Sequence, residues 1–309
     1  MADGGQGPAP APVGPSPVGP LVVACLDPAD LRQEVDPLTG EVRADWRRAD
    51  LSASDGAALE HSLRAAEAWG GTVLALAAGP PGLDPVLEQA VALGARALRV
   101  PWSDAHSGPA VDAVALAAAL AAAISQAGPP ALVVCGDRSP SRGIGAVPAL
   151  IAHHLGAEQA LGLVSLTVDQ SSQVVIAERR LDGGWRERLR VRAPAVCSVE
   201  AAGVRLRRAP FAAALRSSGQ PIPVAASQSG VASTGAQLRI GGPRPYRPRT
   251  KAVAPPMGGT HDRLLALTGV LVAHDPPRIV GPLGPVEAAG ELLDFLDGHG
   301  YSPPSGPAQ

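Results

Sequence analysis

The chain has 309 residues, of which 46% are hydrophobic, so it can bury a sizeable core and is not disordered as a whole. Its 26 basic and 28 acidic residues provide no overall field that would attract nucleic acid or an anionic membrane. The longest aliphatic stretch, 113–124, is shorter than the roughly 20 residues that a bilayer-spanning helix needs, so no membrane span is expected.

The first 19 residues are rich in Pro, Gly and Ala and lack the basic and apolar regions of a secretory signal. We expect this leader, 1–19, to be disordered and the protein to be cytoplasmic. Cys25, Cys135 and Cys197 are widely spaced in apolar runs, which is typical of buried thiols in a reducing compartment.

From Leu21 onward, short apolar runs alternate with segments of helical periodicity. The pattern predicts strands at 21–26, 72–78, 97–100 and 131–135. It predicts helices at 55–69, 84–93 and 111–126, and a further helix that ends near Leu155. This alternation is typical of βαβ units, so we expect an α/β fold with a mainly parallel sheet and helices on both faces.

Beyond Leu161 the pattern changes to short, closely spaced segments at 162–168, 173–179 and 188–192, with a DGG turn at 182–184. These segments predict antiparallel hairpin strands added to the sheet. We therefore expect a domain at 20–216, a Pro/Gly-rich linker at 217–260, and a C-terminal arm at 261–309 with an amphipathic helix at 285–298.

The stretch 132–156, LVVCGDRSPSRGIGAVPALIAHHLG, leads from a predicted strand through a glycine-containing loop into a helix. Loops at the carboxyl ends of parallel strands line the crevice where open α/β sheets bind nucleotides, and backbone N–H groups at a helix start can bind phosphate. Its GxGxxG-like pattern is broken at the last position, so a plain surface turn is an equal alternative from the motif alone. The loop contains two flexible glycines, Gly143 and Gly145, a hydrogen-bonding hydroxyl on Ser141 and a charge on Arg142. Pro148 suits the first turn of the helix that follows.

This loop aligns without a gap with the adenine-nucleotide loop of electron-transfer flavoprotein β subunits, and other segments resemble that family in the same order. They are SDGAALEHSLRAAEAWGGTVLALAAGP (54–80), ALGARALRV (92–100), ERRLDGGWRERLRVRAPAV (178–196), and DPPRIVG (275–281) with the helix after it. The resemblance covers about 21–216 and 274–301. It implies a Rossmann-like fold of the adenine-nucleotide α-hydrolase-like type.

The resemblance implies a site for AMP or another adenine nucleotide at strand ends and helix starts on one side of the sheet. Its candidate residues are Ala24, Ser52, Ala53, Ser54, Asp55, Ala78, Ser141, Arg142, Gly143, Ile144, Gly145, Ala146, Val147, Pro148, Ala149 and Ala152. The loop differs from the family, which usually has acidic and Thr/Gln-Gly residues there, so most side-chain hydrogen bonds to a nucleotide are replaced by backbone contacts.

The resemblance also implies partners. The family binds FAD mainly through an α subunit, while the β subunit closes one side of the site, and electrons pass from a dehydrogenase to a quinone reductase or another acceptor. The family's partner-recognition segment, Leu-Asn-Glu-Pro-Arg-Tyr, is replaced by 203–208, and we favour docking over a solvated strand edge for it. Docking candidates are Gly203, Arg205, Arg207 and Arg208.

This replacement suggests a dedicated flavin- or peptide-cofactor-dependent dehydrogenase as donor, as in the mycofactocin-associated subgroup. Arginines 179, 180, 186, 188, 190 and 192 are interpreted as a solvated sheet face.

Two alternatives remain: a stand-alone nucleotide-binding regulatory protein and an adenylating enzyme of the same broad fold. The long C-terminal arm argues against the first. Against the second, GxSxG, HExxH and Walker A patterns are absent, so we predict no catalytic residues. His153 and His154 are adjacent and would point about 100° apart on a helix, so no metal site is expected there.

Overall fold

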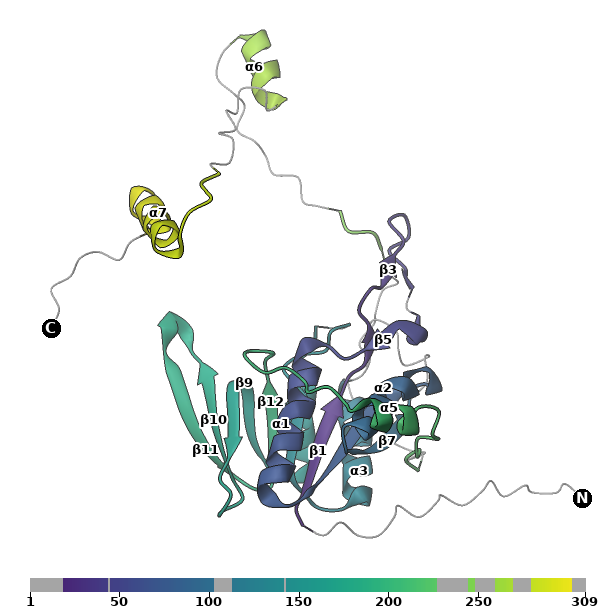
Figure 1. Ribbon diagram of the computed structural model, residues 1–309. Helices are drawn as coiled ribbons and strands as arrows, with labels where there is room; N and C mark the ends of the chain where they lie inside the picture. The colour runs from purple at the N-terminus through teal and green to yellow at the C-terminus, as the bar shows by residue number, and fades with distance from the viewer. Residues whose placement is uncertain are drawn as a thin grey trace, which may run out of the picture. The chain divides into compact units, whose positions relative to one another are not determined.

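The computed structural model describes residues 19–43, 45–102, 113–141, 143–226, 244–247, 259–268 and 279–301 (Figure 1). The chain divides into two compact units, Met1–Tyr246 and Arg247–Gln309. In the described ranges, we find no helix whose length and apolar character would let it span a membrane. The predicted leader falls outside the described residues except for its last residue, Gly19, as does most of the predicted linker.

The first unit is built on a sheet of eight strands in the order β11-β10-β9-β12-β8-β1-β6-β7. Strands from β9 to β7 in this order run parallel, whereas β10 and β11 are antiparallel additions. This arrangement confirms the predicted α/β fold. The strands are β1 (Leu21–Leu26), β6 (Thr72–Gly79), β7 (Arg96–Pro101), β8 (Pro130–Gly136), β9 (Glu158–Val168), β10 (Val174–Arg180), β11 (Arg186–Arg192) and β12 (Ala195–Val199).

Strand β1 lies at the centre of the sheet, and all six of its residues are buried. Val23 pairs in register with Leu74 of β6 and with Val133 of β8. A strand of uninterrupted apolar residues is stable in this position because both of its faces are covered.

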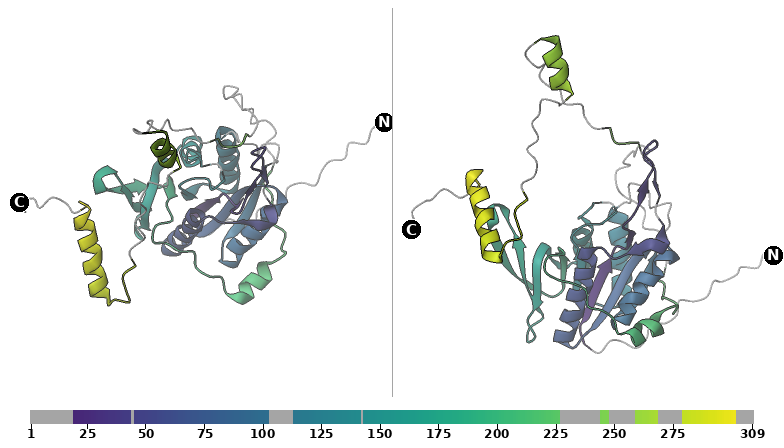
Figure 2. Two further views of the ribbon diagram at one scale, coloured as in Figure 1. Left: turned by 90° about the horizontal axis from the view of Figure 1, so that it is seen from above. Right: turned by 45° about the horizontal axis from the view of Figure 1, so that its top comes forward.

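Helices cover both faces of the sheet (Figure 2). On one face, α1 (Ala53–Trp69) and α2 (Asp84–Ala92) pack through residues such as Leu59 and Leu87. On the other face, α3 (Ala113–Ala127) and α4 (Val147–Leu155) pack through Ile124 and Ile151. The described boundaries of these helices agree with the sequence predictions to within about two residues, although 111 and 112 lie outside the described ranges.

Several short elements were not predicted, and they surround a buried aspartate. They are β2 (Ala29–Asp30), β3 (Glu34–Val35), β4 (Val42–Arg43), η1 (Trp46–Arg48) and β5 (Ala49–Asp50). Asp30 is 4% exposed, and its Oδ2 accepts hydrogen bonds of 2.9 Å from Asp45 N and Arg48 Nη2. Because these bonds satisfy a buried carboxylate, they stabilise the segment 29–50, which has no periodic sequence pattern.

The first unit extends past 216, where the sequence analysis ended its domain. Helix α5 (Phe211–Ser217) spans that position and contacts α2. Beyond it, Pro223 and Ala225 exchange backbone hydrogen bonds with Arg99 on β7, at 2.9 and 2.8 Å, and Ile222 is buried. Proline-rich sequence hides this edge pairing because it lacks strand periodicity.

The described part of the second unit contains α6 (Thr260–Leu267) and α7 (Pro285–Gly298). Helix α7 has the bounds that the sequence predicts. Its apolar side chains are exposed: Val286 is 86%, Leu293 61% and Phe295 51% accessible. A group of exposed apolar side chains of this size is normally covered by another surface.

Candidate functional site

A pocket lies at the carboxyl ends of the parallel strands, where the strand order reverses between β1 and β8. Open α/β sheets bind their ligands at such a switch point. Most of the lining is apolar, and the polar groups are Asp27, Asp55, Arg138 and Ser139. The apolar lining includes Leu26, Ala78, Trp102, Leu116, Leu120, Ile144, Val147 and Pro148.

The loop between β8 and α4 is held by its own backbone. Ser139 N donates to Ile144 O at 2.9 Å, and Gly143 N donates to Ser139 O at 2.8 Å. At Gly145, a Cβ atom would lie 2.8 Å from the backbone oxygen of Asp137, so a side chain there would force the turn apart. The loop is therefore a tight turn whose shape is fixed by its own backbone.

Asp55 connects three elements beneath the pocket. It lies at the third position of α1, is 2% exposed, and its Oδ2 accepts a 2.6 Å hydrogen bond from the hydroxyl of Ser52, the N-cap of the helix. Its Oδ1 lies 3.4 Å from the backbone nitrogen of Asp27, just after β1. A Cβ atom on Gly136 would lie 2.9 Å from Asp55 Oδ1, so a larger residue at this end of β8 would displace the Asp55 side chain.

Burial, and to a smaller extent the neighbouring Asp27 carboxylate, raise the pKa of Asp55 to about 7, against the hydrogen bonds from Ser52 and Asp27 N that lower it. The two acidic side chains line the same pocket. Asp55 can therefore exist near neutral pH either as a hydrogen-bond donor or as an anion.

The three cysteines are free and buried, as predicted. Burial raises the pKa of Cys197 to about 12, and a hydrogen bond with Cys25 together with burial raises the pKa of Cys135. Reactive cysteines need a lowered pKa, so Cys135 and Cys197 are packing residues. Within the described ranges, no three His, Cys, Asp or Glu side chains are grouped as metal ligands would be.

The pocket brings together only some of the predicted nucleotide-site residues: Asp55, Ala78, Ile144, Val147 and Pro148. Ala24 and Ala152 are buried in the two core clusters, and Ser52 caps α1. Ser141 lies 3.3 Å from Ser139 between hydroxyl oxygens, and Arg142 lies outside the described residues. Two further candidates, Ala53 and Ser54, lie at the start of α1. The loop between β8 and α4 contains Gly143 and Gly145, and the start of α4 contains Ala146 and Ala149.

Sequence reasoning missed Asp27, Trp102, Arg138 and Ser139. Each lies one to three residues after the last residue of a strand, which is Leu26, Pro101 or Gly136. Position after a parallel strand was therefore the signal that could have identified them.

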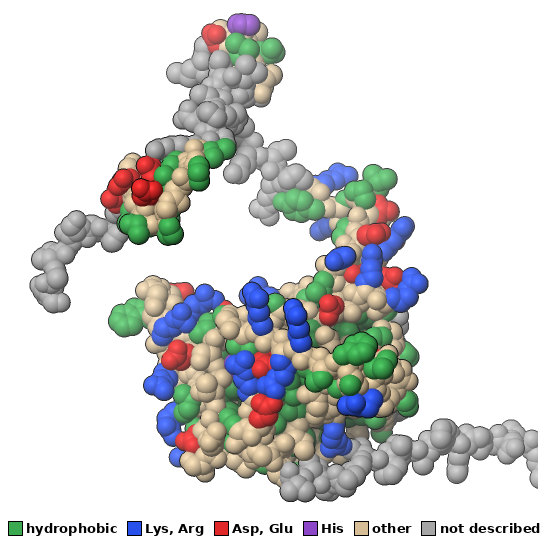
Figure 3. Space-filling view, in the orientation of Figure 1, with side chains coloured by type: hydrophobic (Ala, Val, Ile, Leu, Met, Phe, Trp, Pro, Cys, Tyr) green, Lys and Arg blue, Asp and Glu red, His purple; other side chains and the backbone are tan. Residues whose placement is uncertain are grey.

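The predicted docking segment is divided by the structure. Gly203, Arg205 and Arg208 are exposed. Arg207 instead binds α1 of its own chain: its Nε lies 3.0 Å from Glu60 Oε2, and its guanidinium also binds Glu67 (Figure 3 shows acidic and basic side chains together over α1). Burial acts to raise the pKa of Glu60, but hydrogen bonds from Arg207 and Arg64 hold it below its ordinary value.

The residues present fit a nucleotide in part. The start of α4 lines the pocket through Val147 and Pro148, and a helix start can bind phosphate. The apolar walls suit a flat base, and Asp27 and Asp55 can accept hydrogen bonds from a base or ribose. The pocket measures about 70 Å³, whereas ligand pockets usually measure about 300–1,000 Å³. A whole nucleotide would therefore extend into the open mouth.

Comparison with known sequences gives consistent results. The protein FixA of Bradyrhizobium diazoefficiens is 29% identical over 195 residues, which are 62% of this chain and 66% of FixA. The FixA protein of Rhizobium meliloti is 29% identical over 172 residues, covering 53% of this chain and 58% of that protein. The electron transfer flavoprotein subunit beta of Methylophilus methylotrophus is 26% identical over 163 residues, covering 52% and 60%.

The chain thus spans about three fifths to two thirds of the length of these relatives. The sequence profile described as the electron transfer flavoprotein domain matches residues 42–227, from β4 to just beyond the segment that pairs with Arg99. Since this profile covers more than half of the sequence, the chain belongs to the electron transfer flavoprotein domain family.

Proposed function

We propose that this chain is the β-type subunit of a heterodimeric electron-transfer flavoprotein that closes one side of an FAD site formed mainly by an α-type subunit. The family membership supports this role, and the observation that carries it is the switch-point pocket beside the tight loop between β8 and α4. FAD would accept and release the electrons, and the chain would provide position and electrostatics.

In this proposal the pocket holds AMP or another adenine nucleotide as a structural ligand. The backbone of 143–146 and the start of α4 would bind its phosphate, and Ile144, Val147 and Trp102 would contact its apolar faces. Asp27 and Asp55 would accept hydrogen bonds at the inner end. In this proposal FAD is bound where this chain meets the α-type subunit.

The donor in this proposal is a flavin- or peptide-cofactor-dependent dehydrogenase, such as that of a mycofactocin system, and the acceptor is a quinone reductase or similar protein. Exposed Arg205 and Arg208, with Gly203, provide the docking segment for the donor, while Arg207 positions it through Glu60. The exposed apolar face of α7 would bind the α-type subunit.

The experiment is co-expression with an α-type subunit, purification through a tag on this chain, and a visible absorption spectrum. A yellow one-to-one heterodimer that releases AMP on denaturation is expected. Gly145→Ala should lose AMP because its Cβ meets Asp137 O, whereas Gly290→Ala, with open space around it, should retain it. A colourless chain that does not bind the subunit would refute the proposal.

A second candidate is a stand-alone adenine-nucleotide-binding regulatory protein. The observation that favours it is the position of the pocket at the switch point of a parallel sheet, where α/β proteins that act alone also bind their ligands. Isothermal titration of the purified single chain separates the two candidates. AMP or ATP binding by a colourless monomer that ignores the α-type subunit would support this second candidate.

A further inference from the structure

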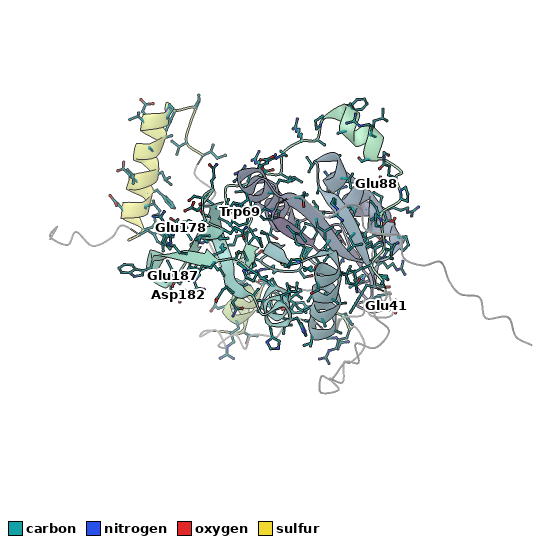
Figure 4. The ribbon with its side chains drawn as sticks, turned by 90° about the horizontal axis from the view of Figure 1, so that it is seen from below. Glu41, Trp69, Glu88, Glu178, Asp182 and Glu187 are labelled. Carbon is teal, nitrogen blue, oxygen red and sulfur yellow. The ribbon has the colours of Figure 1, made fainter. Side chains whose placement is uncertain are left out.

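The antiparallel strands β10 and β11 have one covered and one open face. On the covered face, Val175 and Ala177 are buried, and Leu189 and Val191 pack against the same core. Trp69 at the end of α1 also reaches this region, where its Nε1 donates to Asp169 O at 2.8 Å (Figure 4 shows Trp69 near the hairpin that bears Glu178 and Glu187). Cross-strand partners share a face, so the register places the remaining side chains on the open side.

The open face has a row of four arginines on the edge strand β11. They alternate with the core-facing residues and are all exposed, at intervals of about 7 Å along the strand. None of them forms an ion pair with any residue in the part of the chain that the structure describes. The nearby Arg179 and Arg180, by contrast, bind Glu187 and Glu200. The row consists of Arg186, Arg188, Arg190 and Arg192.

At one end of this row, the hairpin turn exposes two apolar side chains. Trp185 is 74% and Leu181 47% accessible. Leu181 N donates to Trp185 O at 2.9 Å, which fixes both residues at the base of the DGG turn. The other tryptophans, Trp46, Trp69 and Trp102, are only partly exposed. Exposed tryptophan beside arginine is the combination that dominates the binding energy of protein interfaces.

Solvation alone does not explain this surface. Charges on an edge strand prevent unwanted strand pairing, which accounts for arginines on β11. A mixture of signs would serve that purpose without the repulsion between like charges, and it would not require an exposed tryptophan. Since the whole chain is slightly acidic, the row is also a local excess of positive charge, visible along the hairpin edge in Figure 3.

We propose that this surface, called here the hairpin face and defined as Leu181, Trp185 and the four arginines, binds the α-type subunit. The partner would present an apolar socket for Trp185 within an acidic surface. This inference rests on the proposed function, and it adds a second surface for the same subunit to the apolar face of α7. A protein is favoured over a polyanion because Glu178 lies opposite Arg188 within the row and would repel a phosphate chain.

The test measures the dissociation constant of the full chain and the α-type subunit, with a fluorescent label on the subunit. Trp185→Ala is expected to weaken binding by about tenfold or more. The double variant R188E/R190E should weaken it by at least about tenfold and reduce its dependence on salt. If charge reversal prevents folding, as thermal melting would show, R188Q/R190Q replaces it.

Matched controls are F211A, which removes an 83% exposed aromatic side chain on α5, and R32E/R43E, which makes the same charge change on exposed residues elsewhere. Both should bind as the wild type does. Equal binding by all variants, or equal losses in variants and controls, would overturn the inference while the yellow heterodimer kept the proposed function. If the variants lost binding only to a 20-nucleotide RNA, the hairpin face would be assigned to nucleic acid. If the wild type did not bind the α-type subunit, both proposals would be overturned.

Discussion

Replacing Asp55 by asparagine should remove a pH dependence from the stability of the fold. In the folded chain the pKa of this carboxyl is about 7, whereas exposure on unfolding returns it to its ordinary 3.8. The folded state thus binds the proton more tightly than the unfolded state. The stabilising contribution of protonated Asp55 is fully present below pH 3.8 and is lost as the pH rises through 7. Three pKa units at about 1.4 kcal/mol each correspond to about 4 kcal/mol.

Asparagine keeps the shape of the protonated acid and its hydrogen-bonding capacity towards Ser52, but it does not titrate. Subtracting the wild-type unfolding free energy from that of D55N removes the contributions of the distant carboxyls. The difference should shift in favour of D55N by about 3 kcal/mol between pH 5 and pH 8.

Urea unfolding followed by tryptophan fluorescence, at half-unit steps from pH 5 to pH 8, measures this difference. The control is D169N, because hydrogen bonds from Ser171 lower the pKa of Asp169 and its titration lies below this range. Its difference from wild type should stay constant. If the D55N profile also runs parallel to that of the wild type, within about 1 kcal/mol, Asp55 is ionised in the folded state and the reasoning fails.

Two further substitutions test the packing around the site. Gly136→Ala should destabilise the chain by about 1–3 kcal/mol in urea unfolding, because its Cβ would lie 2.9 Å from Asp55 Oδ1; an unchanged midpoint would show that the strand end can move. Arg207→Ala should cost about 2 kcal/mol, since it leaves Glu60, 3% exposed, without its main cation, whereas exposed Arg205→Ala should change stability by less than about 0.5 kcal/mol. Equal effects of these two arginine variants would contradict an internal role for Arg207.

The sheet and its main helices could be predicted because their patterns are local. Runs such as Leu21–Leu26 are apolar without interruption, and the helices α2 and α3 show periodic burial. Helix α5 was missed because its seven residues, three of them alanine, contain less than two full periods. The pairing of Pro223 and Ala225 with Arg99 was missed because it depends on an open edge far away in sequence.

The candidate site was predicted in position rather than in membership. Ile144, Val147 and Pro148 line the pocket because a loop after a buried strand must face the crevice. The role of Arg207 was not visible, since its partner Glu60 lies 147 positions earlier and nothing local distinguishes a paired arginine from a free one. The resemblance to electron-transfer flavoproteins located the segment, and the ion pair defined what one of its residues does.

The segment that pairs with Arg99 has a consequence for how the protein can be shortened. With Pro223 and Ala225 in place, β7 is not the bare edge of the sheet. A chain cut after Ser217 would keep every strand and helix that the structure describes in the first unit, yet it would expose the unpaired backbone groups of β7 to neighbouring molecules. Exposed edges of this kind join one sheet to another, so such a fragment should fold and then aggregate. The proline-rich segment therefore covers the edge strand β7 and prevents it from pairing with another sheet. Its first residues belong to any minimal version of this domain.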